Sequence, residues 1–386
     1  MAQGEGPVRL SDEELKGLWL GRVWRPGIGP SVVTLRDGVA VDITSKTAPT
    51  VRDVLELEDP AAHVRDASGE SLGTASDISG LTDAKDSLHW LAPCDLQAVK
   101  ACGVTFAQSM VERVIEEKAA GDPSKADAIR KRVTEIIGDS LQSLVAGSEK
   151  AAEVKAELIR VGIWSQYLEV GIGPDAEVFS KAQPLSSVGT GAEIGLHPVS
   201  TWNNPEPEIV LAVNSRGEVP GVTLGNDVNL RDIEGRSALL LPMAKDNNAS
   251  CAIGPMIRLF DETYSLDDAR AAVLDLTVEG EDGYVLAGRS LMSEISRDPL
   301  DLVKHVVGLH HQYPDGFMLF LGTLFAPIED RDHPGQGFTH KIGDRVTIAS
   351  DGLGRLENTV RLSTDCPQWT FGLADLMRNL AGRNLL

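Results

Sequence analysis

Two glutamates and one aspartate form the most chemically suggestive pattern in the sequence. Glu206 and Glu208 lie two residues apart at the entry to an apolar run, and Asp227 follows Glu208 by 19 residues. Side chains at positions i and i+2 of a strand share one face, so the two glutamates should project together. Because neighbouring carboxylates repel one another, this arrangement favours a cation bound between them.

The three side chains also indicate which kind of cation they would bind. Hard carboxylate oxygens suit Mg²⁺, Mn²⁺ or Ca²⁺ better than zinc or copper. Pro207 lies between the glutamates and cannot donate a ladder hydrogen bond, so this segment should be a strand start or a sheet edge. A second interpretation stays open, in which Glu206 and Glu208 are exposed edge-strand charges and Asp227 is a turn residue.

The elements that would position these residues begin with a small module of helices and strands. Residues 31–45 contain two β-branched runs around Asp37-Gly38, which predicts a β-hairpin. Thr50, with Asp53 three residues later, is typical of a helix cap before the segment VRDVLEL. We therefore expect an N-terminal α+β domain over residues 1–93.

The remainder, residues 94–386, should form a second domain rich in β-strands. Residues 109–160 are rich in helix-forming side chains and predict about three helices. After Trp164 the chain consists of short apolar runs between glycines, prolines and polar residues, and these runs predict strands: YLEVGIG, EVFSK, EIVLAVN, VTLGNDV, VLDLTVEG, FMLFLGTLF and DRVTIAS. The fold class is therefore α+β.

Composition limits the partners of the protein. The 386 residues include 57 acidic and 36 basic side chains, a net charge of -21, which argues against a nucleic-acid or anionic-membrane partner. No export signal or membrane-spanning run is evident, and the four cysteines are scattered, so we expect a cytoplasmic protein with reduced thiols. A small molecule is the expected partner.

From about residue 95 to its C-terminus the chain resembles the fumarylacetoacetate hydrolase family. The matching segments are GVTF at 103–106, EVFSK at 177–181, PEPE at 205–208, GNDV at 225–228, Lys245 with Gly254-Pro255, and Gly322-Thr323. The resemblance implies a β-rich C-terminal domain with a mixed β-sandwich roll. It also implies that Glu206, Glu208 and Asp227 bind Mg²⁺, and that the chain forms homodimers or homotetramers.

Within that family the chain is most similar to sugar-acid dehydratases. The similarity is carried by long stretches such as WNNPEPEIVLAV and HQYPDGFMLFLGTLFAPIEDRD. It implies a Mg²⁺-dependent hydro-lyase that converts 2-keto-3-deoxy-D-xylonate (2-dehydro-3-deoxy-D-arabinonate) to 2,5-dioxopentanoate in oxidative pentose catabolism.

One departure from the family pattern bears on the reaction. Hydrolases and decarboxylases of this family carry a His-x-x-Glu pair after the GVTF-like segment, whereas this chain has Ser109 and Glu112 at these positions. Loss of the histidine removes the usual means of activating water for C–C cleavage, while the glutamate can still transfer protons. We predict Glu112 as the general acid/base, with Glu116 as the alternative, and Ser109 as a residue near the substrate.

The resemblance assigns three further residues to the substrate pocket. Lys245 is expected to hold substrate oxygens and to take part in proton transfer. Thr323 is expected to donate its hydroxyl to the substrate carboxylate. Lys181 would pair with the substrate or with a metal-binding carboxylate.

Two other functions compete with dehydration. A hydrolase of a diketo acid or a 2-oxo acid decarboxylase could use the same fold, and Ser109 in place of histidine argues against both. A non-catalytic protein stabilised by its metal is the third alternative, and Lys245 and Glu112 beside a complete ligand set argue against it.

Overall fold

The computed structural model describes residues 6–80, 86–137, 144–162, 164–325, 327, 329–335 and 337–386. Its strands form two sheets, and the larger sheet has eleven strands in the described part of the chain. The order is β4-β3-β2-β1-β11-β10-β9-β14-β6-β7, and β5 pairs with β1. These strands are β1 Trp19–Arg25, β2 Gly29–Arg36, β3 Val39–Asp42, β4 Glu70–Thr74, β5 His89–Leu91, β6 Ala98–Gly103, β7 Glu177–Ala182, β9 Pro207–Val213, β10 Gly221–Asp227, β11 Cys251–Leu259 and β14 Phe317–Phe320.

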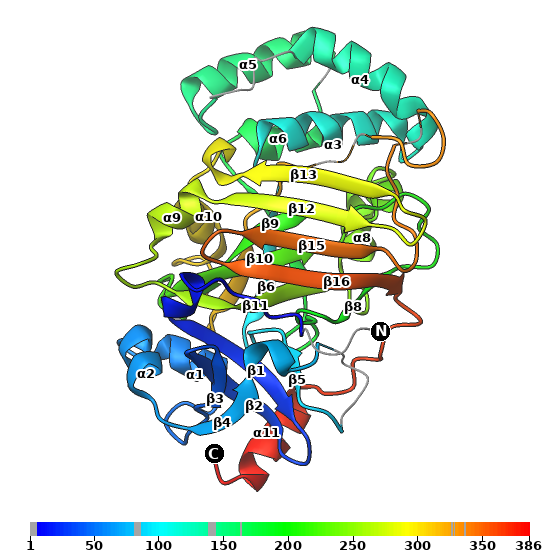
Figure 1. The fold of residues 1–386 in the computed structure, drawn as a ribbon. Helices are drawn as coiled ribbons and strands as arrows, with labels where there is room; N and C mark the ends of the chain where they lie inside the picture. Colours follow the sequence, from blue (N-terminus) through cyan, green and yellow to red (C-terminus); the bar gives the residue numbers. More distant parts are fainter. Residues whose placement is uncertain are drawn as a thin grey trace.

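The second sheet has the order β13-β12-β15-β16-β8 and packs against the first (Figure 1). Its strands are β8 Glu193–Leu196, β12 Val273–Glu279, β13 Val285–Leu291, β15 Arg345–Ser350 and β16 Gly354–Leu362. Leu211 and Leu224 of the larger sheet share a buried core with Leu276 and Ile348 of the smaller one. The inner faces of both sheets therefore make the main core, which stabilises the strands that carry the acidic residues.

Helices gather at opposite ends of the molecule (Figure 1). At one end lie α3 Ala107–Ala119, α4 Pro123–Ile137, α5 Glu149–Arg160 and α6 Gln166–Ile172. At the other end lie α1 Val51–Glu56, α2 Pro60–Asp66 and α11 Leu373–Gly382. Shorter helices connect the strands: α7 Arg231–Glu234, α8 Leu241–Lys245, α9 Leu266–Ala271 and α10 Pro299–Val306. Among the described helices, none is both long and apolar enough to cross a bilayer.

The N-terminal predictions agree with the structure. Strands β2 and β3 form the predicted hairpin, and Asp37 and Gly38 have φ angles of 49° and 77°, as a tight hairpin turn requires. The Thr50 side chain accepts a hydrogen bond from Asp53 N at the start of α1. Strand β1 also pairs with β11, so one sheet continues across the predicted boundary at residue 93, and that boundary remains a prediction.

The three predicted helices of residues 109–160 are α3, α4 and α5, but one predicted strand is wrong. The run YLEVGIG, placed among the strands on its apolar composition, forms helix α6. Ser165 caps this helix by accepting a hydrogen bond from Tyr167 N. Tyr167, Leu168 and Ile172 are buried at helical spacing, and α6 packs against α3. The apolar composition of this run suits a strand or a helix, and the packing against α3 favours the helix.

Candidate metal centre and active site

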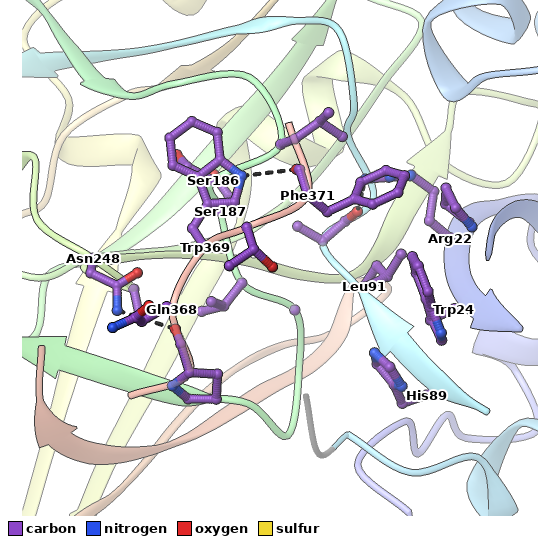
Figure 2. A pocket seen from close by; sticks show the side chains of 18 of the residues that line it. Arg22, Trp24, His89, Leu91, Ser186, Ser187, Asn248, Gln368, Trp369 and Phe371 are labelled. Atoms are coloured by element: carbon purple, nitrogen blue, oxygen red, sulfur yellow. Dashed lines mark hydrogen bonds between the residues drawn. The ribbon is translucent and has the colours of Figure 1, made fainter. Parts of the chain in front are cut away.

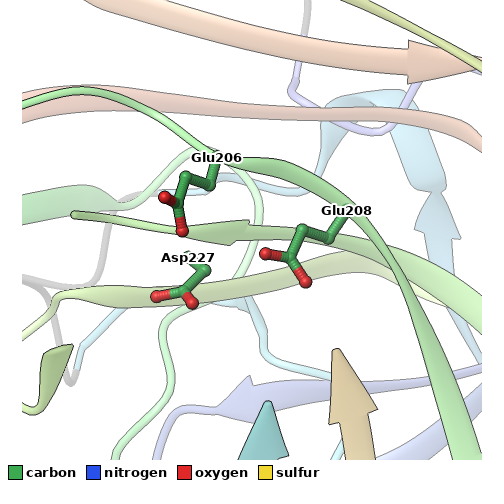
Figure 3. Close-up of side chains that lie close together, drawn as sticks. All are labelled: Glu206, Glu208 and Asp227. Carbon is green, nitrogen blue, oxygen red and sulfur yellow. The ribbon is translucent and has the colours of Figure 1, made fainter. Parts of the chain in front are cut away.

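Glu206, Glu208 and Asp227 converge at the start of β9 and the end of β10 (Figure 3). The two strands are antiparallel neighbours, with Glu208 opposite Gly225, and Asp227 N donates to Glu206 O at 3.1 Å. This register places the three side chains on one face, and one carboxylate oxygen of each lies within 4.8 Å of the others. The acidic cluster predicted from the sequence is confirmed, and β9 begins at Pro207 as expected for a strand start.

All three carboxylates are buried, which rules out the interpretation as exposed edge charges. Glu208 is 1% exposed, and its Oε2 accepts a hydrogen bond from Gly322 N at 2.7 Å. Burial, together with the charges of Asp227 and Glu206, raises the pKa of Glu208 well above its usual value. A cation bound between these groups would lower that pKa, so the donor set fits a divalent metal with a preference for oxygen.

Three cationic side chains partly neutralise the cluster. Lys245 Nζ lies 2.5 Å from Glu206 Oε2 and 3.0 Å from Asp227 Oδ2. Lys181 Nζ lies 2.7 Å from Asp227 Oδ1, and Arg113 Nη2 donates to Glu206 Oε1 at 2.5 Å. Burial alone would raise the pKa of Asp227, but Lys181 and Lys245 outweigh it and hold that pKa below its usual value.

The wider cluster carries a surplus of negative charge. Around the three ligands lie four more carboxylates and five cationic side chains: Glu112, Glu116, Glu177 and Glu234, with Arg113, Arg130, Arg231, Lys181 and Lys245. When all seven carboxylates are ionised they face five cations, and a divalent ion would then balance the two remaining charges. Lys245 itself stays protonated in this surrounding, because Asp227, Glu206 and Glu234 outweigh burial and raise its pKa.

A narrow pocket opens beside the ligands. Among its lining residues are Ser109, Glu206, Asp227, Lys245 and Thr323. Thr323 Oγ1 accepts a hydrogen bond from Phe325 N at 3.1 Å, which leaves its hydroxyl proton free for an oxygen in the pocket. Ser109 Oγ, in contrast, donates to Phe106 O at 2.9 Å within its own helix.

Gly322 lets the chain approach the metal ligands closely. Its φ angle is 91°, in the left-handed region, and a Cβ atom there would clash with Thr105 Oγ1. With no side chain, Gly322 can direct its N–H at Glu208 while the next residue, Thr323, faces the pocket.

Glu112, the predicted acid/base, lines an adjoining pocket that shares Ser109, Glu206 and Thr323 with the first. Its two oxygens accept hydrogen bonds from Arg130 at 2.9 Å each, and Arg231 lies 3.4 Å away. The alternative residue, Glu116, forms ion pairs with Arg113 and Arg231 at 2.7 Å each. Both glutamates are therefore held by guanidinium groups in this structure.

Glu177 is a pocket residue that the sequence analysis missed. It lines the pocket beside the ligands, and among the described residues its carboxylate has no hydrogen bond or ion pair. Burial raises its pKa, and the opposing effect of Arg113 only partly offsets this. A signal was present, because Glu177, Phe179 and Lys181 alternate along β7 and share a face, so the assignment of Lys181 could have been extended to Glu177.

Arg113 and Glu234 were missed as well. Arg113 Nη1 lies 2.9 Å from Glu234 Oε2, and both side chains line the same pocket. Arg113 directly follows Glu112 on α3, but its contact with Glu206 spans 93 residues of sequence. No local pattern could have indicated that contact.

A larger cavity of about 170 Å³ lies elsewhere, between β1, β5 and the segment 367–371 (Figure 2). Its walls are mostly apolar and include Trp24, Trp369 and Phe371. Arg22 faces it, but its guanidinium donates to the carbonyls of Ala92 and Cys94. Because no cluster of titratable groups lines this cavity in the described part of the chain, the chemistry is better placed at the acidic pocket.

Comparison with known proteins identifies one matching family. The family described as "Fumarylacetoacetate (FAA) hydrolase C-terminal" matches residues 171–361. This range contains β7 to β15, β16 except its last residue, and the three acidic residues of the cluster.

Two relatives have related names. A probable 2-keto-3-deoxyxylonate dehydratase of Haloferax volcanii is 30% identical over 306 residues, which cover 77% of this chain and 98% of the relative. A 2-dehydro-3-deoxy-D-arabinonate dehydratase of Saccharolobus solfataricus is 29% identical over 230 residues, which cover 59% of this chain and 72% of the relative.

Solved structures share the fold. The apo form of a 2-keto-3-deoxy-D-arabinonate dehydratase superimposes with a TM-score of 0.60 at 21% identity, covering 89% of this chain and 98% of the other. A complex of 2-keto-3-deoxy-D-arabinonate dehydratase with magnesium and 2,5-dioxopentanoate gives the same TM-score at 22% identity and the same coverage.

Proposed function

Because this chain belongs to the fumarylacetoacetate hydrolase family, we propose that it is a Mg²⁺-dependent hydro-lyase acting on 2-keto-3-deoxy-D-xylonate. The product would be 2,5-dioxopentanoate, and the reaction would serve oxidative pentose catabolism. The observation that carries this proposal is the buried Glu206–Glu208–Asp227 cluster beside Lys245, in a pocket that has Ser109 where the family's hydrolases have histidine. The names of the two relatives support the same substrate class.

Binding would start at the acidic cluster. Glu206, Glu208 and Asp227 would hold Mg²⁺, which, when bound, supplies a Lewis acid for the C2 carbonyl of the substrate. Thr323 would donate its hydroxyl to the substrate carboxylate. Lys245, a cation in this surrounding, would hold the oxygen on which negative charge develops.

Proton transfer needs a carboxylate that is free to exchange a proton. A base removes a C3 proton, the C3=C4 bond forms, and the C4–O bond breaks so that the hydroxyl leaves, once protonated, as water. Transfer of a C5 proton to C3 gives the C4=C5 enol, and transfer of the enol hydroxyl proton to C4 then gives the aldehyde. Glu112 was the predicted group, but its oxygens are occupied by Arg130. We favour Glu177, because it lines the metal pocket with a raised pKa and has no partner among the described side chains.

The experiment that tests the function is a product analysis. Purified protein with Mg²⁺ and 2-keto-3-deoxy-D-xylonate is expected to release 2,5-dioxopentanoate, detected by mass spectrometry or by a coupled aldehyde oxidation. Release of pyruvate would instead indicate C–C cleavage, and no product from any 2-keto-3-deoxy acid would overturn the proposal. Replacing Mg²⁺ by Mn²⁺ or Ca²⁺ tests which hard cation the site accepts.

We also propose a cytoplasmic homodimer or homotetramer that binds neither nucleic acid nor membrane. The surplus of acidic side chains supports the last two points. Gel filtration with light scattering tests the assembly, and cell fractionation tests the location.

A further inference from the structure

The ladder between β9 and β10 continues beyond the metal ligands to a pair of asparagines. Asn204 and Asn229 exchange two backbone hydrogen bonds, of 3.0 and 3.1 Å. This pair lies two residues along each strand from Glu206 and Asp227. Alternate pairs of a ladder share one face, so the asparagine side chains lie on the face of the metal ligands, about 7 Å further along the strands.

Both asparagines are buried and incompletely hydrogen-bonded. Asn204 is 2% exposed and Asn229 is fully buried. Asn204 Nδ2 donates to Pro205 O at 2.9 Å, but Asn204 Oδ1 and both polar atoms of the Asn229 side chain have no partner within the described chain. A buried polar atom without a partner is destabilising, so this row is suited to a ligand that supplies hydrogen bonds.

The pocket next to the metal cluster reaches Asn204, whereas Asn229 lines neither pocket. Asn204 lines it together with Glu206, Ser109 and Thr323. A carboxylate or a keto oxygen only accepts hydrogen bonds and cannot satisfy Asn204 Oδ1. A hydroxyl has one proton to donate, and it therefore matches the free acceptor Asn204 Oδ1.

We propose that Asn204 is a recognition residue for the C5 hydroxyl of the substrate. This inference rests on the proposed function, which places C1 and C2 at the metal cluster and expels the C4 hydroxyl as water. C5 is then the remaining carbon that carries a hydroxyl. Asn204 would make the site specific for sugar acids over plain 2-oxo acids.

The kinetic test compares two substrates in the wild type and in Asn204→Leu. One is 2-keto-3-deoxy-D-xylonate, and the other is its 5-deoxy analogue, which can still lose water from C3 and C4. Asn204→Leu is expected to lower kcat/KM for the first substrate about 100-fold, because sites built around a hydroxyl discriminate strongly. For the 5-deoxy analogue the two proteins should agree within about threefold.

A binding measurement separates recognition from turnover. With Mg²⁺ present, calorimetry on the wild type should show about tenfold tighter binding of 5-hydroxy-2-oxopentanoate than of 2-oxopentanoate, since one such hydrogen bond contributes about 1.4 kcal/mol. Asn204→Leu and Asn204→Ala should each lose this preference. Asn204→Ala keeps the test valid if Asn204→Leu does not fold.

Thr223→Val is the matched control. Thr223 is fully buried on the same ladder face, and its Oγ1 also has no partner among the described groups, but it lies on the far side of Glu208 and lines neither pocket. Thr223→Val should keep the kinetic preference for 2-keto-3-deoxy-D-xylonate over its 5-deoxy analogue. It should also keep the tighter binding of 5-hydroxy-2-oxopentanoate. If the wild type and both Asn204 variants discriminate equally between the hydroxylated and the deoxy compounds, the inference is overturned. Failure of the wild type to dehydrate any 2-keto-3-deoxy acid would overturn the proposed function. The calorimetric comparison of 5-hydroxy-2-oxopentanoate with 2-oxopentanoate does not need turnover, so it would still test the hydroxyl site.

Discussion

Lys181 Nζ lies 2.7 Å from Asp227 Oδ1, although three strands separate β7 from β10 in the sheet. The sheet must therefore curve strongly enough to bring its edge strand over the metal ligands. Lys181 is fully buried and also donates to Val228 O at 3.2 Å and to Lys245 O at 2.5 Å. This one ammonium group ties together β7, the end of β10 and the helix that carries Lys245.

The first prediction concerns that ammonium group. Lys181→Met should lower the free energy of unfolding by about 3–5 kcal/mol, because it leaves Asp227 and two carbonyls without their buried cation. Urea denaturation in EDTA measures this. Lys100→Met is the control. Lys100 on β6 donates only to Ser180 Oγ on β7 among the described residues, and the change should alter stability by no more than about 0.5 kcal/mol. Equal stability of both variants would show that Lys181 is dispensable.

The second prediction concerns the metal ligands. Asp227→Ala should abolish turnover and also the rise in Tm that Mg²⁺ produces, because one of three ligands is lost. Differential scanning fluorimetry across a Mg²⁺ titration measures the shift. Asp275→Ala removes an exposed carboxylate on β12 that pairs with Arg289, and it should keep both properties. A Mg²⁺-dependent shift that survives in Asp227→Ala would refute the ligand assignment.

The third prediction distinguishes the two candidate proton-transfer groups. Glu177→Gln should lower kcat by about 10²–10⁴-fold and leave the Mg²⁺-dependent Tm shift in place, because it removes a proton acceptor but no ligand. Glu112→Gln should mainly lower stability, because it breaks the ion pairs with Arg130 and Arg231. Steady-state kinetics and thermal unfolding of both variants provide the comparison. Slow turnover in Glu112→Gln with normal activity in Glu177→Gln would return the role to Glu112.

The fourth prediction is a pH dependence of stability. Burial raises the pKa of Glu234 to about 7, and Arg113 and Lys245 only partly oppose it. Since an unfolded glutamate has a pKa of about 4.3, the folded protein binds more protons between these values. The free energy of unfolding should therefore fall as pH rises through this window, by at most about 1.4 kcal/mol per pH unit from this group.

Glu234→Gln isolates that contribution. In EDTA, the stability of the wild type minus that of the variant should decline between about pH 4.3 and 7 and become level above it. Denaturant unfolding at a series of pH values measures the difference. A difference that rises with pH would mean that Glu234 is a stabilising carboxylate with a lowered pKa.

Local rules were sufficient for part of this protein. The two-residue spacing of Glu206 and Glu208 implies a shared face wherever those residues form a strand, and the structure has that strand. The cap at Thr50 and the turn at Asp37-Gly38 also depend on neighbouring residues alone. These predictions succeeded because the interactions that decide them span only a few residues.

Tertiary structure decided the rest. Three features depend on segments that are far apart in sequence. They are the helix at YLEVGIG, the ion pair of Glu112 with Arg130, and the position of Glu177 in the lining of the metal pocket. The sequence thus determined which carboxylates could bind a metal together. Only the folded chain, through the curvature of one sheet and the packing of α3, decided which cations neutralise them and which carboxylate remains free, because ion pairing depends on distances that no local pattern encodes.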